Sequence, residues 1–263
     1  MKRVIWILAA VFSFVAASAQ TTDEVINKYL SAAGGKEKLQ AINTLQYTET
    51  LSLNTPMGAM EFSIQNIKER GKLLRRQTTN EITGESFMLI TDTAGYLLMP
   101  SNPMFGLEGG LEKMKTDQLK AMSTEMDCSG YFIQLVDHAT KGFTASLAGE
   151  EKIDGRVSYK LELKKDDNIL TYMVDKETGL INALVAKGAA AAALSGLTAM
   201  GLGDSGGKAS KAELTFKYAD YKEVNGVKMP GTIKMDTPFG VLETKISDIK
   251  INEQVDAKWY KAQ

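Results

Sequence analysis

The chain has 263 residues, of which 44% are hydrophobic, and this length is ample for a single core. Its 31 basic and 32 acidic residues nearly cancel, so its charge gives no reason to expect nucleic acid or an anionic lipid surface as a partner. With one histidine and one cysteine, the chain lacks the ligands of common His/Cys zinc sites, and a Ser-His-Asp or Cys-His catalytic centre is disfavoured.

Residues 1–19 have the pattern of an export signal peptide. Lys2 and Arg3 form a positive start, residues 4–16 are uncharged and mostly apolar, and small residues precede a cleavage point after Ala19. The apolar run is shorter than the roughly 20 residues of a membrane-spanning helix, although an uncleaved anchor is the alternative. We therefore expect a mature chain in the periplasm, with secretion as the second choice, and not an integral membrane protein.

Residues 21–42 predict two helical segments. Thr21 or Thr22 can cap the first, with Glu24 completing a capping box. Its apolar face holds Val25, Ile26, Tyr29, Leu30 and Ala33. Two glycines at positions 34 and 35 end this helix, and a shorter turn over residues 36–42 follows.

From residue 45 onward the hydrophobic pattern takes the two-residue period of strands with one wet face. Residues 45–53 and 60–65 alternate in this way, and the Thr-Pro-Met-Gly turn at 55–58 predicts a hairpin between them. Residues 233–246 predict a second hairpin of the same kind, with a Thr-Pro-Phe-Gly turn at 237–240. Further hairpin turns are indicated at Asp154-Gly155, Thr178-Gly179 and Asn225-Gly226. This spacing predicts a meandering antiparallel sheet that either closes as a barrel or curls around something.

Two segments interrupt the predicted strands. Residues 112–126 have the pattern of an amphipathic helix that can lie across an open sheet, and residues 130–138 can add a shorter one. Residues 188–209 form an Ala/Gly-rich insertion with almost no charge. The insertion is either a flexible connector, which we expect, or a small apolar flap.

The polar residues form no recognisable catalytic centre. The acidic pairs at 150–151 and 166–167 sit beside turns, where we expect them to face water. The basic residues between 68 and 76 are expected at solvated strand ends, with an inward Arg75 or Arg76 that meets a polar head group as the alternative. Cys128 follows two acidic residues, which raise a thiol pKa, so a buried, unreactive thiol is expected. We predict no catalytic residue, no metal and no cofactor.

Apolar residues occupy three loop tips, where polar side chains are usual. Met57, Phe239 and the pair Met104 and Phe105 each lie between a proline and a glycine. Methionine adapts its shape to varied partners, which suits a site for flexible chains. We predict that these tips form the rim of an apolar cavity; the alternative is that each folds back onto its own sheet.

Several stretches resemble the LolA/LolB-like group of envelope lipoprotein carriers, especially its divergent Bacteroidota-type members. They are residues 34–39 with Ile42 and Leu45, residues 149–155 with 159–161, residues 172–175 with 178–180, and residues 218–230 with 251–252. The resemblance implies a mainly β (α+β) fold, in which a strongly curved antiparallel sheet forms an unclosed β-barrel with covering α-helices. It also implies an apolar cavity that accepts lipoprotein acyl chains or other lipids.

We therefore expect residues 20–263 to form one LolA-like lipid-binding domain, a non-enzymatic carrier in the cell envelope. Its ligand would be a lipid or a lipoprotein acyl chain, and its role would lie in outer-membrane lipoprotein sorting. The expected cavity residues are Phe62, Ile64, Met88, Ile90, Tyr172, Val174, Phe216 and Tyr218 on strands, with Met114, Leu119 and Met122 on the covering helix. Ordinary packed core is the alternative for each. The alternative function is an envelope sensor or protein-interaction module that binds a protein partner on the same fold.

Overall fold

The computed structural model describes residues 20–55, 58–80, 84–101, 108–187, 191, 213–237 and 240–262. The main strands are β1 Thr44–Thr55, β2 Gly58–Glu69, β3 Leu73–Asn80, β4 Gly84–Thr91, β5 Gly95–Met99, β6 Gly110–Lys113, β7 Thr144–Ile153, β8 Arg156–Lys165, β9 Asn168–Asp175, β10 Ile181–Lys187, β11 Glu213–Ala219, β14 Thr232–Thr237 and β15 Gly240–Ile251. A separate pair consists of β12 Lys222–Val224 and β13 Val227–Met229. The helices are α1 Thr22–Ala32, α2 Lys36–Gln40 and α3 Thr116–Met122, with short 3-10 turns η2 Ser123–Met126, η3 Ile133–Leu135 and η5 Ala257–Tyr260.

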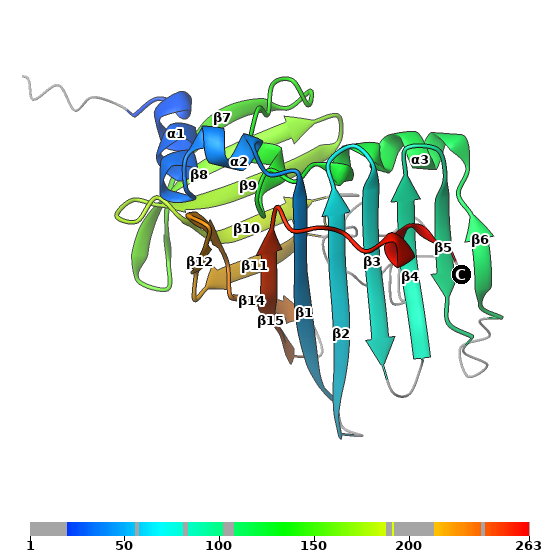
Figure 1. The fold of residues 1–263 in the computed structure, drawn as a ribbon. Helices are drawn as coiled ribbons and strands as arrows, with labels where there is room; N and C mark the ends of the chain where they lie inside the picture. Colours follow the sequence, from blue (N-terminus) through cyan, green and yellow to red (C-terminus); the bar gives the residue numbers. More distant parts are fainter. Residues whose placement is uncertain are drawn as a thin grey trace, which may run out of the picture.

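The thirteen main strands form one antiparallel sheet in the order β6-β5-β4-β3-β2-β1-β15-β14-β11-β10-β9-β8-β7. The sheet is strongly curved, and β6 and β7 remain at its two open edges (Figure 1). This arrangement confirms the predicted fold class, a mainly β protein with an unclosed sheet and a few covering helices. Among the residues that the structure describes, no helix has the length and apolar composition needed to cross a membrane.

The hairpins predicted from turn residues are present. Strands β1 and β2 pair up to Thr55 and Gly58, and β14 and β15 pair up to Thr237 and Gly240. Between β7 and β8, Asp154 and Gly155 have φ values of 46° and 87°, the left-handed backbone that a tight hairpin requires. The Asn225-Gly226 turn also makes a hairpin, but its strands β12 and β13 pair outside the large sheet.

Helix α1 begins with the predicted capping box. The Thr21 hydroxyl accepts a hydrogen bond from the Glu24 amide, while the Glu24 carboxylate accepts one from the Thr21 amide. The helix ends against the β12–β13 hairpin, where Gly34 has φ +127° and a Cβ would lie 2.3 Å from the Gly226 carbonyl oxygen. Glycine is therefore required for this close approach.

The predicted helix over residues 112–126 is wrong at its start. Residues 110–113 form β6 and pair with β5, and only Thr116–Met122 is α-helical before the η2 turn. Pairing with the edge of β5 satisfies the backbone hydrogen-bonding groups of these residues. The helix therefore begins only at Thr116, three residues after the end of β6. The predicted helix at 130–138 is also wrong, because it is only the single turn η3.

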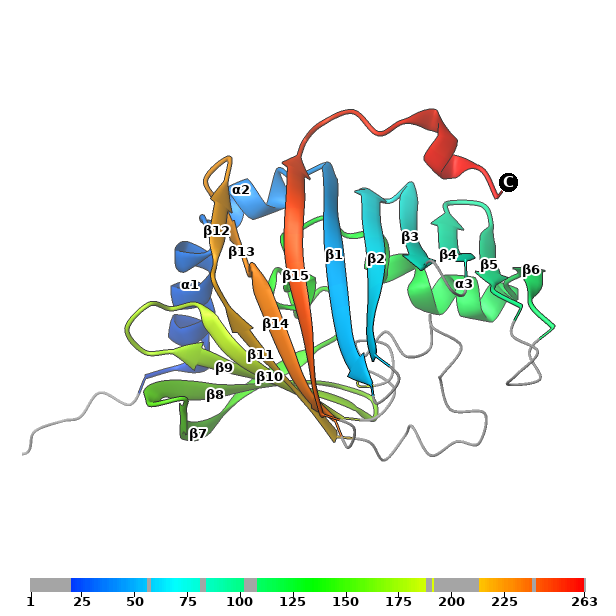
Figure 2. The same cartoon turned by 90° about the horizontal axis from the view of Figure 1, so that it is seen from below.

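The sheet has a different covering on each face. On the concave face, α1 and residues from Phe132 to Val136 build the main core at one end, and α3 packs on Leu74 and Ile90 at the other end (Figure 2). On the convex face, the C-terminal η5 turn places Trp259 over a small cluster that contains Leu73 and Phe87. The segment from α3 to Phe143 therefore runs across the concave face of the sheet. We call it the crossing segment.

Candidate functional site

A cavity of about 270 Å³ lies between the concave face of the sheet and the crossing segment. This volume is near the lower end of the about 300–1,000 Å³ that is usual for small-molecule sites. The strands contribute Tyr47, Glu49, Leu51, Ile64, Asn66, Lys68, Leu74, Arg76, Thr78, Met88, Leu170, Tyr172, Leu184, Phe216, Tyr218, Ile233, Met235, Leu242 and Thr244. The crossing segment contributes Met122, Glu125 and residues 131–134. Most of these side chains are apolar or aromatic, so the space suits a hydrocarbon chain.

The structure divides the residues that the sequence analysis assigned to the cavity. Those that line it are Ile64, Met88, Met122, Tyr172, Phe216 and Tyr218. Those that instead pack in the surrounding hydrophobic clusters are Phe62, Ile90, Met114, Leu119 and Val174. The predicted rim residues Met57, Met104, Phe105 and Phe239 lie outside the described residues, as does the 188–209 insertion apart from Ala191.

One wall of the cavity is aromatic. Phe132, from the crossing segment, makes edge-to-face contacts with Tyr131, Tyr172 and Tyr218, with ring centroids 4.8–5.8 Å apart. The centroid of the Phe132 ring also lies 5.9 Å from that of Tyr29 on α1, so Phe132 connects the cavity wall to the main core. Such ring pairs add roughly 0.5–1.5 kcal/mol each beyond the burial of their surface. The crossing segment is therefore well anchored at Phe132.

The cavity lining also contains an ion pair that sequence reasoning missed. Arg76 on β3 donates a hydrogen bond to the Glu49 carboxylate on β1 at 3.1 Å, and the Glu49 side chain is only 7% exposed. Burial is the largest influence and opposes the charge on Arg76, but the Glu49 carboxylate together with Tyr47 and Tyr131 outweighs burial and raises the pKa of Arg76. The expected position of Arg76 at a solvated strand end is wrong, because Arg76 lines the cavity; the head-group contact of the alternative stays a prediction.

Two further polar groups near this pair lack partners. The Asn66 Nδ2 and the Arg76 Nε are buried and have no hydrogen-bond acceptor in the described part of the chain. Asn66 lies directly opposite Arg76 in the β2–β3 pairing and opposite Tyr47 in the β1–β2 pairing, so the three residues form one row across the sheet. An unsatisfied buried donor costs about 1–3 kcal/mol, which makes this row unusual for ordinary packed core.

Three tyrosines surround the ion pair. Burial raises the pKa of Tyr47, Tyr131 and Tyr218, and the charge of Glu49 raises it further in each case. Their hydroxyl groups therefore remain protonated at neutral pH and can donate hydrogen bonds. The charged residues that line the cavity are Glu49 and Glu125 against Lys68 and Arg76, so their formal charges cancel.

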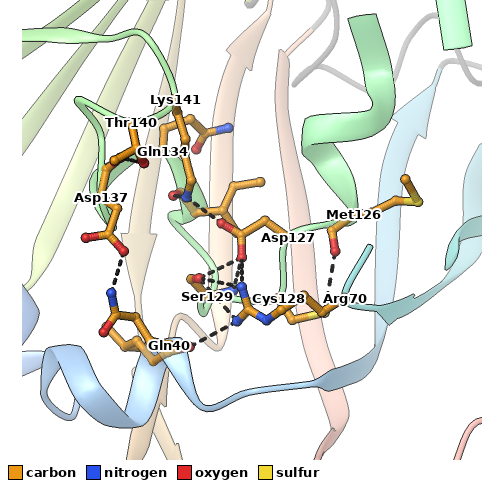
Figure 3. A network of polar contacts seen from close by, with 12 residues as sticks. Gln40, Arg70, Met126, Asp127, Cys128, Ser129, Gln134, Asp137, Thr140 and Lys141 are labelled. Carbon is orange, nitrogen blue, oxygen red and sulfur yellow. Dashed lines mark hydrogen bonds and ion pairs between the residues drawn. The ribbon is translucent and has the colours of Figure 1, made fainter. Parts of the chain in front are cut away.

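The crossing segment is fastened to the sheet by a polar network around Asp127, which Figure 3 shows. Its Oδ1 accepts hydrogen bonds from Arg70 Nη1 at 2.7 Å and from the Ser129 hydroxyl at 2.6 Å, and its Oδ2 pairs with Lys141. Arg70, at the turn after β2, also donates to the carbonyl oxygen of Ile42 at 2.7 Å. The network therefore joins residues 127–141 to two other parts of the chain.

Lys68 and Arg75 are also more buried than predicted, whereas the Lys72 side chain is 66% exposed, as predicted. Arg75 is 4% exposed on the convex face, where its guanidinium lies 4.1 Å from the centre of the Phe87 ring. It donates a hydrogen bond to the Lys261 carbonyl oxygen at 2.6 Å and so holds the C-terminal segment. Neighbouring strand residues face opposite sides of a sheet, which explains why Arg75 and Arg76 have separate roles.

Cys128 is fully buried, as predicted, and burial is the main cause that raises the pKa of its thiol to about 11. We expect no reaction with a thiol reagent such as DTNB at mildly alkaline pH in the folded protein, because the thiolate fraction is small and access is blocked. The thiol should react promptly once the chain is unfolded in guanidinium chloride. Rapid labelling of the native protein would show that the crossing segment opens readily.

The described residues contain no cluster of three or more His, Cys, Asp or Glu side chains that could hold a metal ion. The acidic residues at 150–151 and 166–167 are exposed, as predicted. The site is thus an apolar space with one polar patch, which is suited to binding.

Neither the protein-family models nor the curated proteins include a match to this sequence. Solved structures do match. A LolA superfamily protein from Nitrosomonas europaea superposes with a TM-score of 0.55 at 14% identity, covering 92% of this chain and 98% of that one. A DUF1329 family protein from Desulfovibrio piger gives 0.56 at 10% identity, covering 93% and 98%. A Vibrio parahaemolyticus domain assigned to outer membrane lipoprotein sorting gives 0.54 at 14% identity, covering 91% and 95%.

These matches define the class of fold. Each covers nearly the whole of both chains, so the likeness extends over the curved sheet and is not confined to one hairpin. The resemblance to LolA-like proteins that the sequence suggested is confirmed at the level of the fold. At such low sequence identity the similarity shows a shared fold and nothing more.

Proposed function

We propose that this protein is an exported, non-catalytic binding protein of the cell envelope that holds a lipid or lipoprotein acyl chain in its cavity. The observation that carries the proposal is the apolar cavity of about 270 Å³ enclosed between the curved sheet and the crossing segment. The fold shared with a domain assigned to outer membrane lipoprotein sorting supports a carrier role. An export signal at residues 1–19 and a single mature domain are part of the proposal.

Burial of hydrocarbon supplies the affinity in this proposal. Each buried methylene contributes about 0.8 kcal/mol, so about ten methylenes contribute roughly 8 kcal/mol before the cost of immobilising the chain. The proposed contacts include Ile64, Met88, Met122, Phe216 and Tyr218. The loop tips at Met57, Met104, Phe105 and Phe239 remain the proposed rim.

A pair of variants on one strand tests the proposal. Thr244 lines the cavity, whereas Val241 on the same strand is 53% exposed, so Thr244→Trp should fill the space and Val241→Trp should not. We expect native mass spectrometry of gently purified wild-type protein to show a co-bound lipid. The lipid should be lost in Thr244→Trp and kept in Val241→Trp. Circular dichroism checks that both variants fold.

The outcome distinguishes the proposal from its alternative. A sensor or protein-interaction module with a collapsed cavity would carry no lipid, and binding of a fluorescent acyl probe would be absent or equal in the two variants. Either result would count against a carrier.

A further inference from the structure

The polar patch in the cavity wall serves no purpose for a hydrocarbon tail. Glu49 and Asn66 are each 5% exposed, and both line the cavity together with Arg76. Burying an ion pair and an unpartnered amide beside an apolar chain is unfavourable unless the ligand also brings a polar group. The patch therefore points to the head of the acyl chain and not to its tail.

The unpartnered atoms indicate which polar group fits. Asn66 Nδ2 and Arg76 Nε are both donors, and the two residues are direct partners in the β2–β3 pairing. The protonated Tyr47 hydroxyl belongs to the same row, because Tyr47 is the partner of Asn66 on β1. The complementary ligand atom is a hydrogen-bond acceptor, such as a carbonyl oxygen.

The charge balance indicates that this acceptor is neutral. Arg76 is already 3.1 Å from the Glu49 carboxylate, so a ligand anion brought to the same guanidinium would also meet Glu49. Glu125 adds a second negative charge to the lining, and Lys68 a second positive one, which leaves no net charge to compensate an anion. A buried charge needs a partner, whereas a neutral carbonyl needs only a donor.

We infer that the cavity recognises the uncharged ester or amide carbonyl at the head of an acyl chain, through Asn66 and Arg76, and discriminates against the carboxylate of a free fatty acid. The inference rests on the proposed function, because it names the head group of the proposed acyl ligand. The ligand class is then an acyl ester or acyl amide whose carbonyl lies beside the β1–β3 row.

Competition with a fluorescent acyl probe tests this inference on the wild-type protein. The matched competitors are decanoic acid at neutral pH, its methyl ester, its N-methyl amide and decane. We expect the ester and the amide to bind about five- to tenfold more tightly than decane and the acid, the ratio that one buried hydrogen bond supplies.

Two variants locate the effect. Asn66→Leu keeps a similar side-chain volume and should reduce the preference for the ester over decane, while the affinity for decane stays unchanged. Leu184→Ala, a change in the apolar lining, should weaken all four competitors to a similar degree.

The possible results separate the inference from the proposed function. Equal binding of all four ligands would overturn the inference and leave the carrier proposal intact, and so would tightest binding of the free acid. Failure of all four to displace the probe, or of the probe to bind, would overturn both. The wild-type ranking alone decides the matter if Asn66→Leu does not fold.

Discussion

Asp127→Ala should destabilise the protein by roughly 3 kcal/mol, measured by urea unfolding followed by circular dichroism. The Asp127 side chain is 12% exposed and compensates both Arg70 and Lys141, so its removal leaves two cations without their partner. Breaking a buried pair typically costs about 3–5 kcal/mol, and the lower end applies because Arg70 is 34% exposed. Asp137→Asn is the control in the same segment, because the pair with Lys36 that it removes is far more exposed and is worth at most about 1 kcal/mol. Asparagine also tolerates the φ of 53° at this position and can still accept a hydrogen bond from Gln40.

The same network predicts a dependence on pH. Burial opposes the negative charge on Asp127, but the hydrogen bonds from Lys141 and Ser129 outweigh this effect and lower its pKa. Because the folded pKa is below the unfolded value, the stabilisation is fully present above the unfolded value of about 3.9 and is lost as the pH falls through the folded pKa. Wild type should therefore lose stability below about pH 4 more steeply than Asp127→Ala. Parallel acid curves for the two proteins would contradict this account.

Local signals in the sequence were sufficient for much of the fold. The capping box at Thr21 and the hairpin turn at Asp154 each depend on residues within a few positions of one another, so they can be read without knowing the tertiary structure. The start of α3 could not be predicted in this way. Whether residues 110–113 become strand or helix is decided by the exposed edge of β5, which is a tertiary contact.

The polar part of the site illustrates the same limit. Glu49 shares a face with Leu51, and Arg76 with Leu74, so the two-residue period could have indicated that each charged side chain lies on the same face as a buried leucine. Glu49 and Arg76 are 27 residues apart and lie on different strands, and the sequence gives no sign that the sheet brings their charges together. A run of basic residues is usually solvated, and the expectation for Arg76 followed that general rule and not its position in the alternation.

The Asp127 network was equally hidden. Arg70 and Asp127 are 57 residues apart, and their contact depends on the crossing segment returning to the end of β2. Burial is the largest cause that raises the pKa of the Cys128 thiol; Lys68 and Arg70 lower it, and of the two acidic neighbours that the sequence indicated only Asp127 contributes to raising it. Pattern-based reasoning thus identified the apolar lining better than the charged contacts, because apolar faces repeat along a strand and ion pairs do not.

A double-mutant cycle on Glu49 and Arg76 should separate stability from ligand recognition. Glu49→Leu alone should cost about 3–5 kcal/mol, because it leaves the Arg76 guanidinium in the cavity wall without its partner. Arg76→Met alone should have a similar cost. The double variant should be near wild type, because well-packed apolar residues often replace a buried ion pair without loss. The coupling energy should exceed about 2 kcal/mol.

The exposed pair Lys234 and Glu243 provides the control, with side chains 52% and 39% exposed and an expected coupling below about 1 kcal/mol. If the Glu49 and Arg76 double variant is as stable as wild type, the fold does not need this ion pair. The double variant should then still bind decane but show a smaller preference for the methyl ester, because the Arg76 donor is gone. A stable double variant that keeps the full ester preference would assign recognition to Asn66 and the tyrosine hydroxyls instead, and would remove Arg76 from the binding site.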